Sequence, residues 1–390
     1  MKMVNYDVII IGAGSVGVPT AFSIAKEGLK VLCIDKNYTI GQSQNKRAIG
    51  GVRATHSQEG KIHLCQRSLE IFRNWEEEYE EDIDWIPGGY CFVAYTDEDE
   101  QLLKETVELQ KEAGLNIDWV DPDEIKELVP GINDNNLRGG TYSPEDGTAS
   151  PLLSINAFYQ QSLSFEADFL FQEKVIDIIT KDNAIIGVKT EKRTYNAPIV
   201  INAAGAHAKQ VAAMAGVNVP VQPDSHEAGI TEMVEKFFST MVVDIRPETN
   251  DHFGNSKNFY FYQNGLGQII FCLTPSPPIV GFDTNETSNF LPQISQRLIK
   301  LLPRLKNIKV RRTWRGLYPM TPDGNPIIGK VKNLDGYINA VGMCGQGFML
   351  APGLGELLAR VVTNKTTKID EEILKEFSLY RDFAEEELLK

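Results

Sequence analysis

The sequence is poor in the residues that build metal centres and disulfide frameworks. Its 390 residues include only five cysteines and five histidines, and no two cysteines form a Cys-x-x-Cys pair. This spacing excludes a zinc or iron–sulfur cage built by this chain alone, so we expect no metal site. Scattered cysteines are typical of proteins in reducing compartments, which predicts a cytoplasmic location.

Membranes and nucleic acids are also disfavoured as partners. No apolar run approaches the roughly 20 residues that a membrane-spanning helix needs, and the residues before Asp7 do not resemble a secretory signal segment. A formal net charge of −14 would repel nucleic acid and anionic lipid. We therefore expect a protein without a membrane span that acts on a small molecule.

The stretch from residue 7 to residue 35 carries the strongest positive signal. Four β-forming residues at 8–11 lead into a turn that contains Gly12, Gly14 and Gly17, and an amphipathic run and a second apolar strand follow. In such a unit the first glycine allows the turn, the second lets the backbone approach a pyrophosphate, and the third lets helix and strand pack closely. This pattern favours a dinucleotide site over its alternative, a plain parallel βαβ unit.

Asp35 closes the second strand of this unit, eighteen residues after Gly17. A carboxylate at this place accepts hydrogen bonds from ribose hydroxyls and would repel a 2′-phosphate, which argues against NADP. NAD and FAD both remain possible from this stretch alone.

Two later segments fit the surroundings of a bound cofactor. The polar loop at 41–53 would run back over the phosphates and bring Arg47 and Arg53 toward the reactive end; the alternative is a solvated basic loop. The apolar strand at 199–203 ends in Ala204 and Gly205, which would suit a flat group pressed against the strand. Close packing between strand and helix is the alternative there.

A second glycine-rich entry into a helix, Gly342–Met349, lies near the end of the chain. The first turn of such a helix offers free backbone N–H groups and a partial positive charge. A nicotinamide has little use for them, whereas a reduced isoalloxazine carries negative charge that they stabilise. The two ends together favour FAD over NAD.

The remaining pattern predicts a two-part α/β fold. We expect helices at 58–80, 97–113, 152–163 and 295–302, a small β meander from 169–171, 174–179, 184–190 and 194–196, and an antiparallel hairpin from 259–263 and 268–273. A doubly wound, Rossmann-like cofactor domain would comprise residues 1–85, 145–215 and 315–390. A mostly antiparallel β-sheet substrate domain would comprise residues 86–144 and 216–314.

These motifs resemble the FAD-dependent amino-acid and amine oxidoreductases related to D-amino acid oxidase. This family includes glycine oxidase, sarcosine oxidase and the β subunits of dye-linked proline dehydrogenase. The resemblance covers 12–35, 45–53, 146–151, 175, 202–206 and 314–352. It implies non-covalent FAD, because Gly316 stands where monomeric sarcosine oxidase has its flavin-bearing cysteine.

The residues that we expect at the FAD come from both ends of the chain and from the loops between them. They are Gly12, Gly14, Ser15, Val16, Gly17, Asp35, Lys36, Ser43, Asn45, Lys46, Arg47, Gly50, Gly51, Val175, Ala204, Gly205, Gly316, Gly342, Gly345, Gln346, Gly347, Phe348 and Met349. By resemblance, the backbone of Val175 would meet the adenine.

The chemistry that the resemblance implies is hydride transfer from the substrate Cα to flavin N5, which gives an imine. Such a step depends on orientation over the flavin, and a substrate carboxylate needs a cation. Tyr318 stands where glycine oxidase has its carboxylate-binding arginine, and Met349 stands where sarcosine oxidase has a lysine.

These departures make Arg53 our predicted carboxylate anchor, with Arg312 and Arg315 as alternatives. We expect Tyr260, Tyr262 and Met349 to line the substrate pocket. The predicted substrate is a small amino acid or secondary amine, proline-like or sarcosine-like. Two alternatives stay open: oxidation of a 2-hydroxy acid or glycerol 3-phosphate on the same fold, and a non-catalytic flavin-carrying subunit. A companion subunit, another electron acceptor or an oligomer would fit the resemblance.

Overall fold

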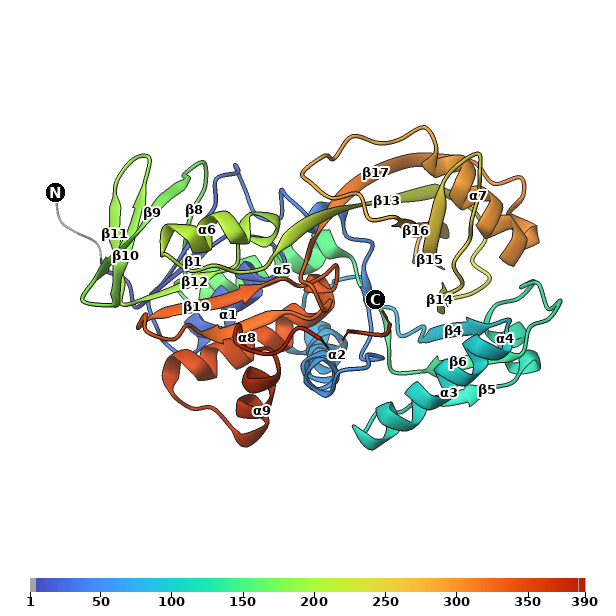
Figure 1. Ribbon diagram of the computed structural model, residues 1–390, viewed down its shortest axis with the longest axis horizontal. Coiled ribbons are helices and arrows are strands. Elements are labelled where there is room, and N and C mark those ends of the chain that lie inside the picture. Colours follow the sequence, from blue (N-terminus) through green and yellow to red (C-terminus); the bar gives the residue numbers. More distant parts are fainter. Residues whose placement is uncertain (1–4, 385, 390) are drawn as a thin grey trace.

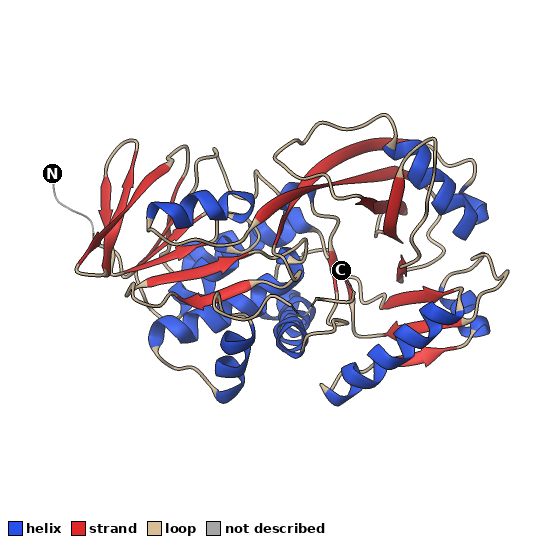
Figure 2. Ribbon diagram, viewed as in Figure 1, coloured by secondary structure: helices blue, strands red, loops and turns tan. Residues whose placement is uncertain are grey.

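The computed structural model describes residues 5–384 and 386–389. Two large β-sheets lie toward opposite ends of an elongated molecule, and helices gather mainly around the first of them (Figures 1 and 2). Within the described residues, no helix is both long and apolar enough to cross a membrane.

The first sheet has six strands in the order β18-β19-β12-β1-β2-β8 and is parallel apart from the antiparallel β18–β19 pair. Its strands are β1 (Val8–Ile11), β2 (Val31–Ile34), β8 (Asp168–Leu170), β12 (Ile199–Asn202), β18 (Ile327–Lys330) and β19 (Tyr337–Val341). Strands β1 and β2 pair in parallel, with Val8 opposite Val31. The predicted βαβ unit at the front of the chain is therefore present.

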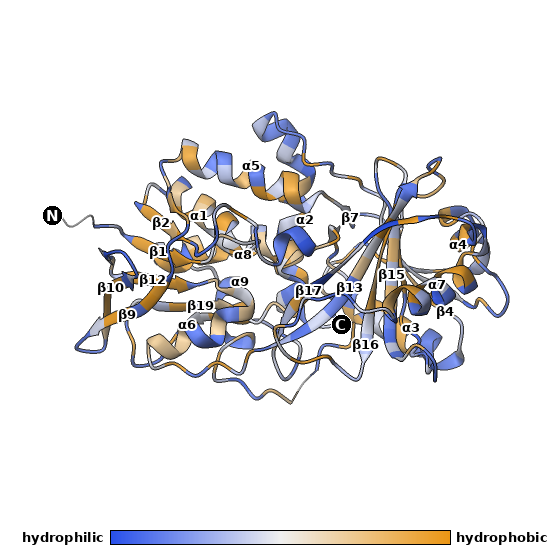
Figure 3. Ribbon diagram, turned by 90° about the horizontal axis from the view of Figure 1, so that it is seen from above, coloured by the Kyte–Doolittle hydropathy of each residue, from blue (hydrophilic) through white to orange (hydrophobic). Residues whose placement is uncertain are grey.

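Helices and a smaller sheet cover the two faces of this sheet. The helices of the molecule are α1 (Gly17–Lys26), α2 (Glu59–Tyr79), α3 (Asp97–Glu112), α4 (Pro122–Leu128), α5 (Pro151–Ser164), α6 (Ala208–Met214), α7 (Phe290–Leu301), α8 (Gly347–Thr363) and α9 (Lys368–Glu376). One buried cluster joins one face to α1, α2, α5 and α8, and a second joins the other face to α6 and the small sheet. Burial on both faces explains why the central strands are apolar throughout (Figure 3).

The small sheet corrects one sequence prediction. It has three strands, β9 (Val175–Lys181), β10 (Ala184–Thr190) and β11 (Thr194–Asn196). The segment at 169–171, which we predicted as a fourth strand of this meander, instead pairs in parallel with β2 through β8. Phe169 of this segment packs edge-on against Tyr159 of α5, and the centroids of the two rings are 4.8 Å apart. This contact favours pairing with β2, because it holds the segment against the helical layer.

The second large sheet has eight strands in the order β17-β13-β16-β15-β14-β4-β6-β5. They are β4 (Tyr90–Ala94), β5 (Asp118–Val120), β6 (Gly139–Ser143), β13 (Gln222–Met233), β14 (Met241–Asp244), β15 (Asn255–Gln263), β16 (Gln268–Ser276) and β17 (Val310–Met320). The predicted hairpin forms as β15 and β16. The parallel β4–β14 pair joins the chain segments 86–144 and 216–314 into one sheet.

Some predicted boundaries shift in this half of the molecule. The helix predicted at 295–302 begins five residues earlier, at Phe290, whose ring packs on Phe271 of the sheet. The predicted domain boundary at 314/315 falls inside β17, which pairs with β13 from Val310 to Met320. A two-stranded ribbon, β3 (Gly51–Val52) with β7 (Gly147–Thr148), lies between the large sheets, and single 3₁₀ turns occur at Asn45–Arg47, Gly205–His207 and Pro303–Leu305.

Candidate active site

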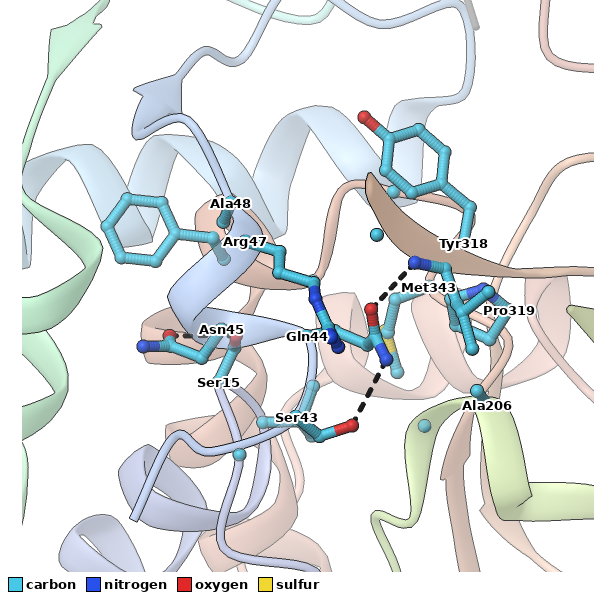
Figure 4. A pocket seen from close by; sticks show the side chains of 18 of the residues that line it. Ser15, Ser43, Gln44, Asn45, Arg47, Ala48, Ala206, Tyr318, Pro319 and Met343 are labelled. Carbon is cyan, nitrogen blue, oxygen red and sulfur yellow. Dashed lines mark hydrogen bonds between the residues drawn. The ribbon is translucent and has the colours of Figure 1, made fainter. Parts of the chain in front are cut away.

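A cavity of about 520 Å³ lies where the carboxyl ends of the parallel strands face the eight-stranded sheet. Its wall combines the glycine-rich turn after β1, the loop at 42–53, the turn after β12, the entry into α8, and side chains of β13, β15, β16 and β17. Figure 4 shows the part where the loop of Ser43–Ala48 meets Tyr318 and Met343. Ligands of open α/β sheets bind at such an edge.

The glycine-rich turn shapes one end of the cavity. Gly12 has a φ of +112°, and a Cβ there would come within 2.6 Å of the Ala203 carbonyl oxygen. A Cβ at Gly14 would meet no atom within 4 Å, so the backbone there is open to a ligand. Gly17 lies outside the cavity wall. A Cβ on it would overlap the carbonyl oxygen of Gly12, so its role is close packing of α1.

Asp35 and Lys36 line the same end of the cavity. The Asp35 carboxylate accepts hydrogen bonds from the backbone N–H groups of Ala13 and Asn37, both at 2.8 Å. The carboxylate therefore holds the glycine turn as well as facing the cavity. Burial lowers the pKa of Lys36, whose Nζ lies 2.9 Å from His207 Nε2.

The loop at 42–53 is tied to both large sheets. Ser15 Oγ donates to Asn45 Oδ1 at 3.0 Å, and Gln44 Oε1 accepts from the Leu317 N–H at 2.6 Å. Trp314 Nε1 donates to the Arg47 carbonyl at 2.8 Å. These bonds fix a polar loop across the cavity, which favours the cofactor interpretation over a solvated basic loop.

Arg47 and Lys46 are neighbours in the sequence, but only Arg47 lines the cavity. The Arg47 side chain reaches into the cavity (Figure 4), where burial lowers its pKa. No described residue accepts a hydrogen bond from its guanidinium. Lys46 is exposed, bonds to Gln42 at 3.2 Å and is not part of the wall. The 3₁₀ turn at Asn45–Arg47 points Lys46 outward, so the predicted contact between Lys46 and the cofactor stays a prediction that the cavity wall does not support.

The entry into α8 forms the middle of the cavity. Gly342 and Gly345 have φ values of +72° and +84°, and a Cβ on Gly345 would overlap the Tyr318 ring. Neither α1 nor α8 has a side-chain N-cap or an acidic residue in its first turn, so backbone N–H groups are left for a ligand. The buried Gln346 Oε1 has no hydrogen-bond partner among the described residues.

The far end of the cavity carries aromatic residues of the eight-stranded sheet. The hydroxyls of Tyr260 and Tyr318 lie 2.7 Å apart, and burial raises the pKa of both phenols. The His226 ring stacks on Tyr318 with centroids 3.8 Å apart. Neither His226 nitrogen has a hydrogen-bond partner in the described part of the chain, although Nε2 lies 3.5 Å from Asp224 Oδ2.

Tyr262 does not line this cavity, which corrects a second prediction. Strand alternation puts it on the same face as Tyr260, as expected. Its hydroxyl, however, donates a 2.5 Å hydrogen bond to the Ile49 carbonyl, so the 42–53 loop covers it. Tyr262 supports that loop instead of facing the cavity.

Arg53 lines the cavity but is already engaged. Its Nη2 donates to the Leu389 carbonyl at 2.5 Å, its Nη1 donates to the Thr55 carbonyl, and its guanidinium lies 5.4 Å from the Phe92 ring. The alternative anchors lie elsewhere: Arg315 pairs with Asp283 at 3.1 Å, and Arg312 is exposed. Neither is part of the cavity wall.

The other predicted site residues all belong to the wall. They are Gly12, Gly14, Ser15, Val16, Asp35, Lys36, Ser43, Asn45, Arg47, Gly50, Gly51, Val175, Ala204, Gly205, Gly316, Gly342, Gly345, Gln346, Gly347, Phe348, Met349, Arg53 and Tyr260. Sequence reasoning missed His226, Tyr90, Phe92 and Leu389, which also line it. The first three alternate within strands, and no local signal distinguishes a residue that faces a cavity from one that faces a core.

Comparison with known proteins identifies this constellation. The model of the family described as FAD dependent oxidoreductase matches residues 7–361. The chain belongs to this family of FAD-dependent oxidoreductases. The cofactor is therefore FAD, as the two uncapped helix ends and the open backbone at Gly14 allow.

Individual relatives span nearly the whole chain. The solved structure of L-proline dehydrogenase from P. horikoshii superposes with a TM-score of 0.89, at 32% identity over 97% of this chain and 98% of that one. Sarcosine oxidase subunit beta of Arthrobacter sp is 26% identical, covering 92% of this chain and 87% of that protein. A hydrogen cyanide synthase subunit of Pseudomonas aeruginosa is 24% identical, covering 94% of each.

Proposed function

We propose that this FAD-dependent oxidoreductase oxidises a small amino acid or secondary amine, proline-like or sarcosine-like, at its CH–NH bond. The observation that carries the proposal is one continuous cavity. It runs from the glycine turn at Gly12, past the entry into α8, to a chamber bounded by Tyr260, Tyr318 and Arg53. Relatives named L-proline dehydrogenase and sarcosine oxidase subunit beta support this substrate class.

The cofactor would be held without a covalent bond. The turn at Gly12–Val16 and Asp35 would hold the nucleotide end, and Gly345–Met349 would hold the ring end with backbone N–H groups at the start of α8. Bound FAD supplies a hydride acceptor. Gly316, whose neighbours are Arg47 and Gln44, offers no side chain for attachment.

The arginines of the loop would bind the charges of the substrate and of the cofactor. Arg53 would anchor the substrate carboxylate, since it lies in the chamber beside the aromatic rings. Arg47 would lie nearer the flavin, because it projects into the cavity next to Gly316 and has a guanidinium without an accepting partner in the described residues. A charge-assisted hydrogen bond between arginine and carboxylate is stronger than a neutral one.

The amine must reach its neutral form before the hydride leaves, since the nitrogen lone pair forms the new C=N bond. His226 would accept the ammonium proton, because its ring lines the cavity and neither ring nitrogen has a hydrogen-bond partner among the described residues. Burial alone would raise the pKa of Asp224, but contact with His226 and backbone N–H groups holds it below its usual value. An ionised Asp224 would stabilise the resulting imidazolium.

Reduction of the bound flavin by a panel of candidate substrates tests the proposed substrate class. FAD-loaded protein is mixed without oxygen with proline, sarcosine, glycine, lactate and glycerol 3-phosphate, and the visible absorbance of the oxidised flavin is followed. The proposal predicts bleaching by the secondary amines. Bleaching by lactate or glycerol 3-phosphate alone would favour a hydroxy substrate, and no bleaching at all would favour a flavin-carrying subunit.

We further propose that the protein works with a companion subunit in a reducing cytoplasm. Two relatives are named as subunits of larger enzymes, sarcosine oxidase and hydrogen cyanide synthase. All five cysteines are free and buried, which suits a reducing compartment. Copurification of the untagged partner at a fixed ratio from the native host would support this, and a native mass equal to one chain or a multiple of it would count against it.

A further inference from the structure

The C-terminal segment 386–389 lies between the two large sheets, beside the chamber end of the cavity (Figure 1). It reaches the front of the chain across more than 300 residues of sequence. Its two inward-facing residues, Glu387 and Leu389, are 2% and 4% exposed, whereas Leu388 between them is 59% exposed. This alternation indicates a segment that is docked, with one face buried.

Glu387 fixes the position of the segment. Its carboxylate accepts from Ser57 Oγ at 2.6 Å, from the Ser57 N–H at 2.9 Å and from Lys61 Nζ at 3.0 Å. The side chains of Lys61 and Glu387 are both fully buried. Burial opposes ionisation, yet Lys61 holds the pKa of Glu387 well below its usual value.

Lys61 in turn depends on the segment. Its other hydrogen-bond acceptor among the described residues is the Gly324 carbonyl at 2.9 Å, so Glu387 supplies its counter-charge. A buried cation without a partner is strongly unfavourable. The ion pair with Lys61 therefore holds Glu387 in place, and Leu389, two residues later, is held beside Arg53.

Leu389 forms part of the chamber wall. Its side chain belongs to the same buried cluster as Tyr90 and Phe92, which also line the cavity. Its carbonyl accepts the 2.5 Å hydrogen bond from Arg53 Nη2. One residue of the segment thus contacts both the apolar wall and the guanidinium that we assign to the substrate carboxylate.

We propose that Leu389 is a specificity-determining residue, whose side chain limits the size of the group beside the substrate carboxylate while its carbonyl orients the Arg53 guanidinium. This inference rests on the proposed function, because it takes Arg53 as the carboxylate anchor. A carboxylate held at Arg53 places its Cα substituents against the wall that Leu389 closes. Shortening this side chain would admit a larger ring or chain.

Substrate size tests the inference directly. In the FAD-loaded protein, Leu389→Ala is compared with Leu388→Ala, a matched change of an exposed leucine one residue away. Two substrates are compared, proline and its six-membered ring analogue pipecolate. The kcat/KM for pipecolate divided by that for proline should rise about 10-fold in Leu389→Ala, because one methylene in an apolar pocket changes kcat/KM by about this factor. It should stay as in the parent protein in Leu388→Ala.

A second variant separates positioning from folding. Glu387→Gln keeps the shape of the side chain but removes the charge opposite Lys61, so the segment should loosen and the size preference should shift in the same direction. FAD absorbance and the melting temperature show that each variant is folded and loaded. A folded, loaded Leu389→Ala with an unchanged pipecolate-to-proline ratio would overturn the inference.

A binding measurement keeps the inference testable if no amine is oxidised. Acetate, cyclopentanecarboxylate and cyclohexanecarboxylate are titrated into the oxidised protein, and the flavin spectrum reports each Kd. Leu389→Ala should tighten the cyclohexanecarboxylate Kd relative to that of acetate, and an unchanged ratio would contradict the inference. Failure of the proposed function appears separately, as the absence of flavin bleaching by any amine in the parent protein.

Discussion

The hydroxyls of Tyr260 and Tyr318 meet at 2.7 Å although their strands, β15 and β17, are separated by β16 and β13 in the sheet. The two side chains therefore lean toward each other above the sheet and close one wall of the cavity. Burial keeps both phenols neutral, so each can donate a hydrogen bond. The pair links β15 to β17, and β17 contacts the 42–53 loop through the hydrogen bond from the Leu317 N–H to Gln44.

We predict that Tyr260→Phe weakens substrate binding and leaves FAD bound. The change removes one partner of a buried hydroxyl pair, which costs on the order of 1–2 kcal/mol, or roughly a 10-fold rise in KM. Tyr262→Phe is the matched control two residues along the strand, because its hydroxyl serves the Ile49 carbonyl and not the cavity. It should lower the melting temperature with little change in KM. Equal effects of the two variants on KM would contradict this assignment.

Removal of the Arg53 guanidinium should raise KM by a large factor. Arg53→Ala loses a charged hydrogen bond to the substrate carboxylate, worth about 1.5–3 kcal/mol, so a rise of roughly 10- to 100-fold is expected. Arg53→Lys should recover part of this loss, and Arg312→Ala, on the exposed part of β17, should leave KM unchanged. Steady-state kinetics measure KM for each variant, and the amount of flavin that the substrate reduces shows whether each variant is loaded with FAD. An unchanged KM in Arg53→Ala would move the anchor to another cation, with Arg47 the nearest candidate in the cavity.

Removal of the His226 imidazole should slow the reaction more than it weakens substrate binding. In His226→Asn, kcat should fall by about 100-fold, a typical contribution of one general base, with little change in KM. The rate of flavin bleaching in a single anaerobic turnover of the FAD-loaded variant gives the measurement. An unchanged rate, with FAD bound, would assign His226 a packing role against Tyr318 only.

Asp146 should make the stability of the protein depend on pH. Burial raises its pKa to about 7, and one carboxylate oxygen has no hydrogen-bond partner among the described residues. The folded protein therefore favours the protonated carboxyl, and stability is lost as pH rises from about 4 toward 7.

Asp146→Asn mimics the protonated carboxyl at every pH and still offers an acceptor to the Ala54 N–H. The difference in melting temperature between the variant and the parent protein should grow between about pH 4 and about pH 7 and then level off, because these are the ordinary pKa of an aspartate and the raised pKa of Asp146. Glu77→Gln, at an exposed position of α2, serves as the control. A difference that stays constant across this range would contradict the prediction.

The sequence specified the cofactor end of the site far better than the substrate end. Gly12 and Gly345 were predictable because positive φ and close contacts demand glycine there, and Gly14 because a ligand-binding turn needs open backbone at that place in the local pattern. Tyr262 was misplaced because strand alternation gives the face of a residue but not which loop covers it. Lys46 lies outside the cavity wall, unlike its neighbours Asn45 and Arg47, because the three residues form a 3₁₀ turn whose side chains point in different directions.

Contacts between distant segments account for what was missed. His226 reaches the cavity only because β13 lies next to β17, and Leu389 only because Glu387 finds Lys61 more than 300 positions away. The segment at 169–171 joined the parallel sheet because its aromatic rings found α5. Such pairings depend on tertiary packing, which overrides local pattern.

The most direct test of the account is a single turnover with an isotopically labelled amine. FAD-loaded protein is mixed anaerobically with proline and then with proline carrying deuterium at its α carbon, and the bleaching rate is recorded. We predict complete bleaching by both, slower with deuterium because the Cα–H bond breaks in that step, and recovery of the cyclic imine as product. A flavin that stays oxidised with proline, sarcosine and every other amine would contradict the central claim that this cavity oxidises CH–NH bonds.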